Sequence, residues 1–304
     1  MKYNYCGKSG LQLPAISLGL WHNFGSIDNY ENAEQIILRA FDMGVTHFDL
    51  ANNYGPVAGS AETNFGRILH NNLLVHRDEM IISTKAGYMM WPGPYGDGGS
   101  RKYLIASLDQ SLKRMGLDYV DIFYSHRYDP NTPIEETMQA LVDIVHAGKA
   151  LYVGISNYPA DKQQQACDYL NAAHVPCLIG QYRANMFDDQ TLQANLPVAI
   201  KNGTGFICFS PLAQGLLTDR YLNGIPADSR VASGRGNGAI DANVLTADKL
   251  NQIRALNEKA QAQGLTLSQY ALQWLLNHEG VTSVLIGASS VKQLETNLSL
   301  FEKE

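Results

Sequence analysis

Short apolar runs, rich in branched and aromatic residues, alternate with longer helical patterns along almost the whole chain. Runs that are apolar throughout, rather than at every second position, are typical of parallel strands covered on both faces by helices. Eight runs are present, which is the number that a closed (β/α)8 barrel requires. They span Ala15–Gly19, Thr46–Ala51, Met80–Lys85, Val120–His126, Leu151–Ser156, Leu178–Gln181, Gly205–Ser210 and Ser283–Gly287. The predicted fold class is therefore α/β, as a TIM barrel.

The segments between these runs carry apolar residues at three- and four-residue steps, which is helical spacing. Tyr103–Met115 shows it clearly, and Gly116 follows as a helix stop. The same spacing predicts helices over Asn32–Met43, Ile134–Val145, Ala160–Ala173, Ala247–Gln263, Leu267–Leu276 and Val291–Phe301. An open doubly wound sheet is the alternative, and it is less favoured because no G-x-G-x-x-G follows the first run.

The chain reads as a single domain over residues 1–304, because no linker-like stretch divides it. Tyr3–Leu13 predicts a β-hairpin before the barrel, where it could plug the bottom opening. The stretches rich in Gly and Pro, Trp91–Ser100 and Gly224–Ala239, fall where loops are due.

Composition and charge make several kinds of binding partner unexpected. The formal net charge is −6 and no run of basic residues appears, so a nucleic-acid surface is not expected. Residues 1–5 lack an apolar signal region, and no stretch reaches the roughly 18 apolar residues of a membrane span, so a cytoplasmic location is expected. The four cysteines form no C-x-x-C pair, and Cys208 in an apolar run predicts a core residue. The sequence contains no H-E-x-x-H or H-x-H motif, so a metal site is not expected.

Polar residues stand where three neighbouring runs end. Asp49 lies at the end of the second run with Tyr54 just beyond, Lys85 ends the third, and His126 ends the fourth. Each alone has an ordinary explanation, as a cap, a solvated charge or a packing ring. Together they would meet at the carboxyl-end rim of the barrel, where active sites of this fold form.

This group suits the reduction of a carbonyl. A phenol with a pKa of about 10 donates a proton poorly at neutral pH, and a Lys85 ammonium held by Asp49 would lower the pKa of Tyr54. His126 could then orient the carbonyl oxygen that Tyr54 protonates. The group contains no nucleophile–base pair of the kind that hydrolysis would use. An aldolase that uses Lys85 as a Schiff base is a remaining alternative.

Several segments carry a family resemblance that covers nearly the whole chain. Six segments resemble motifs of the aldo-keto reductase superfamily and occur in the same order along the chain. They are F-D-L-A-N-N-Y-G, I-I-S-T-K, D-Y-V-D-I-F-Y-S-H-R, G-I-S-N-Y, S-P-L-A-Q-G-L-L-T and L-I-G-A-S-S-V-K-Q-L-E-T-N. Within it, the chain is most similar to bacterial L-glyceraldehyde 3-phosphate reductases and to the branch of the voltage-gated potassium channel β subunits. The resemblance places the catalytic tetrad on Asp49, Tyr54, Lys85 and His126. The channel branch replaces the histidine, which this chain keeps.

The resemblance implies NADPH-dependent reduction of small aldehydes, of the methylglyoxal or L-glyceraldehyde 3-phosphate type. A regulatory or sensing subunit that binds NADPH and turns over slowly is the alternative. A homo-oligomer is expected by analogy alone. Trp21, Tyr88 and Trp91, with Arg127, follow the first four runs and would form an aromatic wall for the substrate around the mouth. Trp21 stands at a position that the resemblance supports, whereas Tyr88 and Trp91 could equally cover the core.

The cofactor residues are likewise implied by the resemblance. They are Ser156, Asn157 and Gln181 for the nicotinamide, Ser210, Pro211, Leu212, Gly215 and Arg220 for the pyrophosphate, and Gly287, Ser289, Gln293 and Asn297 for the adenosine end. Tyr182 or a neighbour would stack on the nicotinamide ring. The start of a helix near Ser289 would favour a 2′-phosphate. Relatives often carry Arg where Ser290 stands and Glu where Thr296 stands, and Lys292 or Arg230 could compensate.

Overall fold

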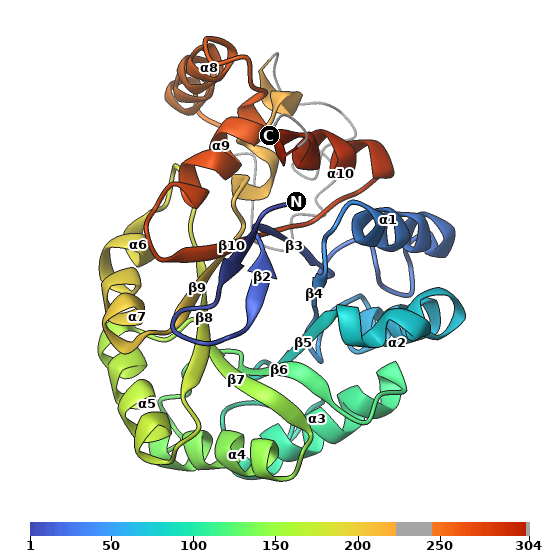
Figure 1. Ribbon diagram of the computed structural model, residues 1–304, viewed down its shortest axis with the longest axis vertical. Helices are drawn as coiled ribbons and strands as arrows, with labels where there is room; N and C mark the ends of the chain where they lie inside the picture. The colour runs from blue at the N-terminus through green and yellow to red at the C-terminus, as the bar shows by residue number, and fades with distance from the viewer. Residues whose placement is uncertain (223–244, 302–304) are drawn as a thin grey trace.

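The computed structural model describes residues 1–222 and 245–301, and its centre is a closed barrel of eight parallel strands (Figure 1). Around the barrel the strands follow the order β10-β3-β4-β5-β6-β7-β8-β9. Their bounds are β3 Ile16–Gly19, β4 His47–Asp49, β5 Ile81–Ala86, β6 Val120–Ser125, β7 Ala150–Ser156, β8 Cys177–Arg183, β9 Gly205–Phe209 and β10 Val281–Ile286. The eight predicted strands are confirmed, with ends that differ by at most two residues.

Helices cover the outside of the barrel, as Figure 1 shows. They are α1 Tyr30–Asp42, α2 Ser60–Ile68, α3 Arg101–Met115, α4 Ile134–His146, α5 Ala160–Ala172, α6 Gln190–Ala194, α7 Leu196–Asn202, α8 Ala247–Gln261, α9 Leu267–Leu276 and α10 Val291–Leu298. The predicted helices are confirmed, and Gly116 caps α3 at φ 67° in the left-handed region that glycine adopts readily. The sequence patterns did not predict α2, α6 and α7.

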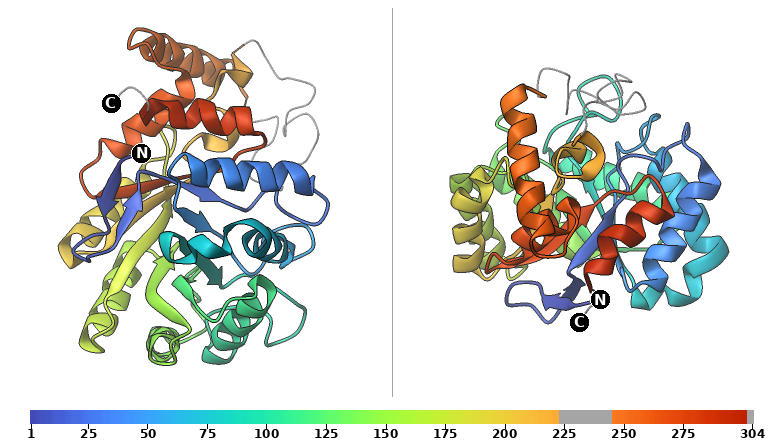
Figure 2. Two further views of the ribbon diagram at one scale, coloured as in Figure 1. Left: turned by 45° about the vertical axis from the view of Figure 1, so that its right-hand side comes forward. Right: turned by 90° about the horizontal axis from the view of Figure 1, so that it is seen from above.

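A two-stranded antiparallel hairpin precedes the barrel, with β1 Tyr3–Tyr5 and β2 Gln12–Pro14. Figure 2 shows it against one end of the barrel. Its fully buried Cys6 and Leu13 cluster with the barrel-interior residues Ile179 and Ile207. The predicted hairpin therefore exists, and it closes the amino end of the barrel.

The four cysteines are all buried as free thiols. Cys208 is fully buried in the core, as predicted. Within residues 1–222 and 245–301, no helix has the length and apolar content that a membrane crossing needs.

Candidate active site

A buried ion pair lies at the carboxyl ends of β4 and β5. Lys85 Nζ is 2.5 Å from Asp49 Oδ2 and donates a second hydrogen bond to the Leu50 carbonyl at 2.6 Å. Asp49 is the register partner of Ser83, two residues before Lys85, so neighbouring strands bring both side chains to the same rim. Burial lowers the pKa of Lys85, and the Asp49 carboxylate opposes that shift.

Tyr54 lies next to this pair, with its hydroxyl 3.5 Å from Lys85 Nζ. Burial raises the pKa of Tyr54 well above its usual value, and the Asp49 carboxylate raises it further. The expectation that Lys85 lowers the pKa of Tyr54 below its usual value is therefore wrong. The physical reason is that the short hydrogen bonds of Lys85 go to Asp49 and Leu50, whereas its contact with Tyr54 is long. Tyr54 is therefore protonated at neutral pH, as any phenol is, and it is a weak acid that donates only to a strongly basic oxygen.

His126 completes the group from the end of β6. Its ring lies edge-on to Tyr54, with 5.9 Å between centroids, and it is nearly fully buried. Burial lowers the pKa of His126 well below its usual value, and Lys85 and Arg127 lower it further. The imidazole is therefore neutral, and its buried Nδ1 has no hydrogen-bond partner in the described parts of the chain.

Two of the three predicted substrate-wall residues lie against the tetrad. Trp21 is 6.2 Å from the Tyr54 ring and Tyr88 is 4.7 Å from the His126 ring, and both side chains remain more than a third exposed. Trp91 packs on Tyr103 at 5.6 Å, and among the described residues it makes no ring contact with the tetrad. The packing of Trp91 is that of a residue that covers the core.

The second carboxylate oxygen of Asp49 is also occupied. Ser83 Oγ donates to Asp49 Oδ1 at 2.6 Å, and Gln181 Nε2 donates to it at 3.2 Å. Gln181 was predicted as a nicotinamide residue, so the structure brings a candidate cofactor residue into contact with the tetrad. Ser83 was not predicted. It lies two residues before Lys85 and therefore on the same inward face of β5, which is a signal the sequence did contain.

Ser156 and Asn157 lie at the end of β7, close to His126. The Asn157 amide donates to the His126 carbonyl at 3.2 Å and to Ser156 Oγ at 3.1 Å. Asn157 holds φ at 55°, a left-handed conformation that Asn tolerates better than most residues. These two residues and Gln181 therefore form one polar edge beside the tetrad.

Tyr182 does not face this edge. It is 1% exposed and stacks on Phe206, with 5.1 Å between centroids, in the main core cluster. Its neighbour Gln181 reaches Asp49, and side chains alternate along a strand, so Tyr182 points away from the barrel interior. Of the two options, Tyr182 or a neighbour, the structure therefore excludes Tyr182 as the residue that stacks on the ring. Phe209, at the end of β9, is partly buried and packs with the interior cluster.

The predicted pyrophosphate residues form a strained loop after β9. Ser210, Ala213 and Gln214 all have positive φ, at 54°, 47° and 59°, and Gly215 has φ 99°. Such conformations cost about 1–3 kcal/mol each in residues other than glycine, and they gather at functional sites. Pro211 and Leu212 lie within this loop, and Arg220 is exposed after it.

The predicted adenosine residues lie at the start of α10. Ser290 Oγ accepts a hydrogen bond from the Gln293 amide and so caps the helix, while Gln293 Oε1 accepts from Ser289. Asn297 is buried, and its Nδ2 has no partner among the described residues. An unsatisfied buried amide is costly, so it fits a contact with a ligand. Gly287 is exposed at the end of β10.

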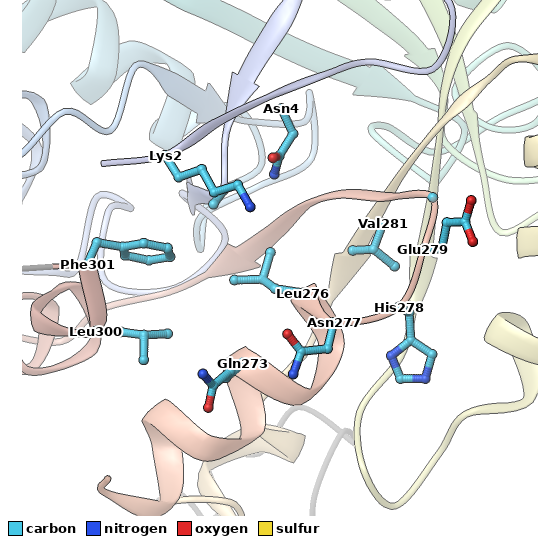
Figure 3. Close-up of a pocket in the computed structure, with 12 residues that line it drawn as sticks. Lys2, Asn4, Gln273, Leu276, Asn277, His278, Glu279, Val281, Leu300 and Phe301 are labelled. Carbon is cyan, nitrogen blue, oxygen red and sulfur yellow. The ribbon is translucent and has the colours of Figure 1, made fainter. Parts of the chain in front are cut away.

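Residues 182–196 contain a turn closed by Asn185 and Asp188 and the short helix α6. Arg230 and all of Gly224–Ala239 lie outside the described residues. The pocket in Figure 3 lies at the opposite, amino end of the barrel, between Lys2, Asn4 and His278, and takes no part in the tetrad.

The chain is similar to known proteins over almost its full length. The model of the aldo/keto reductase family matches residues 15–304. L-glyceraldehyde 3-phosphate reductases of Escherichia coli O157:H7 and of strain K12 are each 58% identical over 300 residues, which is 98% of this chain and 87% of theirs. A probable voltage-gated potassium channel subunit beta of Arabidopsis thaliana is 36% identical over 306 residues, which is 98% of this chain and 90% of its own.

A solved structure shares the architecture. It is that of a thermostable aldo-keto reductase in complex with the inhibitor epalrestat, with a TM-score of 0.76, 27% sequence identity, and coverage of 99% of this chain and 94% of that one. The family match spans the barrel, and two kinds of relative above 30% identity are matched almost end to end. This chain is an oxidoreductase that belongs to the aldo/keto reductase family.

Proposed function

We propose that this protein reduces small aldehydes to alcohols with NADPH, and that Tyr54 donates the proton. The observation that carries the proposal is the group of Asp49, Lys85, Tyr54 and His126 at one rim of the barrel. Tyr54 carries its proton at neutral pH, as a phenol does, and burial, which raises its pKa, keeps that proton in place until a strongly basic acceptor forms. An aldehyde oxygen beside Tyr54 and His126 becomes basic only as hydride reaches the carbonyl carbon. Proton transfer is therefore tied to reduction.

The chain's own residues fit a nicotinamide cofactor. Bound NADPH would supply the hydride. Gln181, Ser156 and Asn157 would hold its carboxamide. Phe209, which packs with the interior cluster at the end of β9, would stack on its ring in place of Tyr182. The strained loop Ser210, Pro211, Leu212 and Gly215, with Arg220, would hold the pyrophosphate.

The adenosine end would lie at the start of α10. The unsatisfied Nδ2 of Asn297 would donate to the adenosine there, with Gly287, Ser289 and Gln293 beside it. Ser290 caps the helix, and the partial positive charge of a helix start favours a 2′-phosphate. Lys292 is exposed in the first turn and adds a positive charge, so we expect NADPH to bind more tightly than NADH.

The substrate would lie between Trp21, Tyr54 and Tyr88, with Trp91 at most an outer contact. Arg127 follows His126, lies 5.4 Å from the Tyr88 ring centroid, and is held by Asp97 at 2.9 Å. A guanidinium at this place suits an aldehyde that carries a phosphate. Methylglyoxal and L-glyceraldehyde 3-phosphate are therefore the substrates to test first, since two relatives carry the name L-glyceraldehyde 3-phosphate reductase.

The test follows the absorbance of NADPH and NADH in parallel, with methylglyoxal and with D- and L-glyceraldehyde 3-phosphate. We expect Tyr54→Phe to lower kcat by about 10²–10⁴-fold, because it removes the proton donor, while cofactor affinity is kept. Tyr95→Phe, at a tyrosine that is 58% exposed, is the matched control and should keep full activity.

Two other outcomes would point elsewhere. Tight cofactor binding without turnover of any aldehyde would favour the regulatory subunit, in line with the 36% identity to a channel subunit beta. Failure of both cofactors to bind would overturn the assignment of the site.

A further inference from the structure

A buried histidine that the mechanism above does not use is linked to the tetrad. His47 lies on β4 two residues before Asp49, and its side chain is fully buried in the barrel interior. Its Nε2 is 2.9 Å from Ser83 Oγ, and its Nδ1 is 2.8 Å from Ser17 Oγ. Ser83 Oγ in turn donates to Asp49 Oδ1 at 2.6 Å. A histidine in this position therefore reaches the carboxylate of the tetrad through one hydroxyl.

The hydrogen bonds continue from Ser17 to the floor of the barrel. Ser17 Oγ is 2.7 Å from Ser283 Oγ, which is 2.7 Å from the Pro14 carbonyl next to the hairpin. The side chains of Ser17 and Ser283 are fully buried. We call Ser283, Ser17, His47 and Ser83 the donor chain. Polar groups of this kind are costly to bury unless each has a partner, and here each has one.

A count of protons gives the donor chain a direction. The Asp49 carboxylate, paired with Lys85, can only accept, so the one proton of Ser83 is used on Asp49. Ser83 Oγ must then accept from His47 Nε2–H. Burial lowers the pKa of His47 to about 4, so the ring is neutral at pH 7 and Nδ1 carries no proton. Nδ1 therefore accepts from Ser17.

At the far end, Ser283 has one proton for two acceptors at 2.7 Å, Ser17 Oγ and the Pro14 carbonyl. The direction is therefore fixed only from Ser17 through His47 and Ser83, whose donors point toward Asp49. Hydrogen bonds that run in one direction polarise and strengthen one another, and this series ends on a carboxylate. An imidazolium at His47 would instead donate from both nitrogens and reverse the bond to Ser17.

We propose that His47, as its Nε2–H tautomer, and Ser83 are positioning residues that hold the Asp49 carboxylate against Lys85. Asp49 fixes the Lys85 ammonium, and that ammonium lies 3.5 Å from the hydroxyl of Tyr54. Loss of the Ser83 hydroxyl would leave Asp49 Oδ1 with only the longer hydrogen bond from Gln181 at 3.2 Å, so the carboxylate and the Lys85 ammonium paired with it would be held less firmly. The inference rests on the proposed reductase function, since it assigns these residues an effect on that reaction.

The kinetic test compares two serines of the same chain. Ser83→Ala removes the hydroxyl that contacts Asp49. Ser283→Ala removes an equally buried hydroxyl, which is separated from Ser83 by Ser17 and His47. We expect Ser83→Ala to lower kcat about tenfold, the worth of one hydrogen bond to a charged group, with little change in KM or in cofactor affinity. Ser83→Thr keeps the hydroxyl and should therefore retain most of the wild-type kcat. Ser283→Ala should have the kcat of the wild type.

Equal kcat losses in Ser83→Ala and Ser283→Ala would overturn the proposal, as would a loss of thermal stability in Ser83→Ala without any change in kcat. Those results would mean that the donor chain packs the barrel interior and does not position Asp49 for catalysis.

A second measurement needs no activity. In ¹⁵N-histidine spectra of the whole protein, with His47→Gln used for assignment, His47 should appear as the neutral Nε2–H tautomer from about pH 5.5 to 8. The charged groups that act on it are Asp49 on the same strand and Lys85 on β5. A neutral Nδ1–H tautomer, or titration near pH 6.5, would contradict the proposal. If no aldehyde is reduced by the wild type, the proposed function fails while this spectrum still decides the direction of the chain.

Discussion

At the scale of single residues, His47 links the chemistry of the barrel interior to the stability of the protein. Burial lowers the pKa of its ring from 6.5 to about 4. Between these two values the unfolded chain binds a proton that the folded protein does not. The free energy of unfolding therefore rises as the pH rises from about 4 to about 6.5, by up to about 3 kcal/mol from this residue.

We therefore expect His47→Gln to be less destabilising in acid than at neutral pH. At pH 5 the wild type has lost about 2 kcal/mol of the contribution of His47, and the variant has no such contribution to lose. The difference in the free energy of unfolding between the two proteins should be smaller at pH 5 than at pH 7.5 by that amount, as measured by urea denaturation. His126 and the other titrating groups are common to both proteins, so they cancel. An equal difference at both pH values would show that folding does not shift the pKa of His47.

The residues of the site differ in how far the sequence could predict them. Lys85 and His126 end apolar runs, so their place at the rim followed from the strand pattern alone. Ser83 and His47 lie inside such runs, and their roles depend on the register of three strands, which periodicity does not provide. Alternation along β8 would have excluded Tyr182 once Gln181 was placed inside.

At the scale of elements, α2 supports the strand that carries Lys85. Glu62 of α2 is fully buried, accepts from Thr84 of β5 at 2.5 Å, and pairs with Arg114 of α3 at 2.7 Å. The first turn of α2 also reaches the Tyr54 carbonyl through the Ala61 amide at 3.3 Å. Two members of the tetrad are thus held in part by one helix. The sequence patterns did not predict this helix, because S-A-E-T-N-F-G-R-I is largely polar and contains a glycine.

Gly66 makes the close approach of α2 to α3 possible. A Cβ atom there would lie 2.6 Å from Met115 Cα and 2.7 Å from its carbonyl oxygen, which are backbone atoms that cannot swing aside. A change from glycine to alanine inside a helix normally stabilises it. Here we expect Gly66→Ala to lower the free energy of unfolding by about 2 kcal/mol, because overpacking outweighs helix propensity.

Denaturation in urea measures this effect. Thr63→Ala, at an exposed position of the same helix, is the control and should stay within about 0.5 kcal/mol of the wild type. A stabilised Gly66→Ala variant would mean that the two helices do not pack this closely.

At the scale of the whole molecule, the barrel separates a stabilising end from a reacting end. The hairpin closes the amino end with Leu13, whereas the tetrad lies at the carboxyl ends of the strands. We expect Leu13→Ala to lower the free energy of unfolding by about 3 kcal/mol through the cavity it leaves, while kcat stays near that of the wild type. Tyr5→Ala, at a hairpin residue that is 63% exposed, should change neither quantity. A fall in kcat for Leu13→Ala under folding conditions would show that the two ends are coupled.

The fold was predictable at this scale for a physical reason. Each parallel strand is buried on both faces, so its apolar run is unbroken and easy to recognise. The closure of the barrel, by contrast, depends on contacts between residues far apart in the chain. No local pattern predicts such contacts.

The seam of the barrel joins β3 to β10, where Ile16 pairs with Val284 and Ser17 meets Ser283 across 266 positions. During synthesis the chain emerges from its amino end. Strand β3 therefore waits with an open edge until residues 281–286 have left the ribosome, and open edges invite pairing with other chains. Over the same interval the donor chain lacks its first serine. A growing polypeptide thus presents Asp49, Tyr54, Lys85 and His126 long before the barrel that surrounds them has closed.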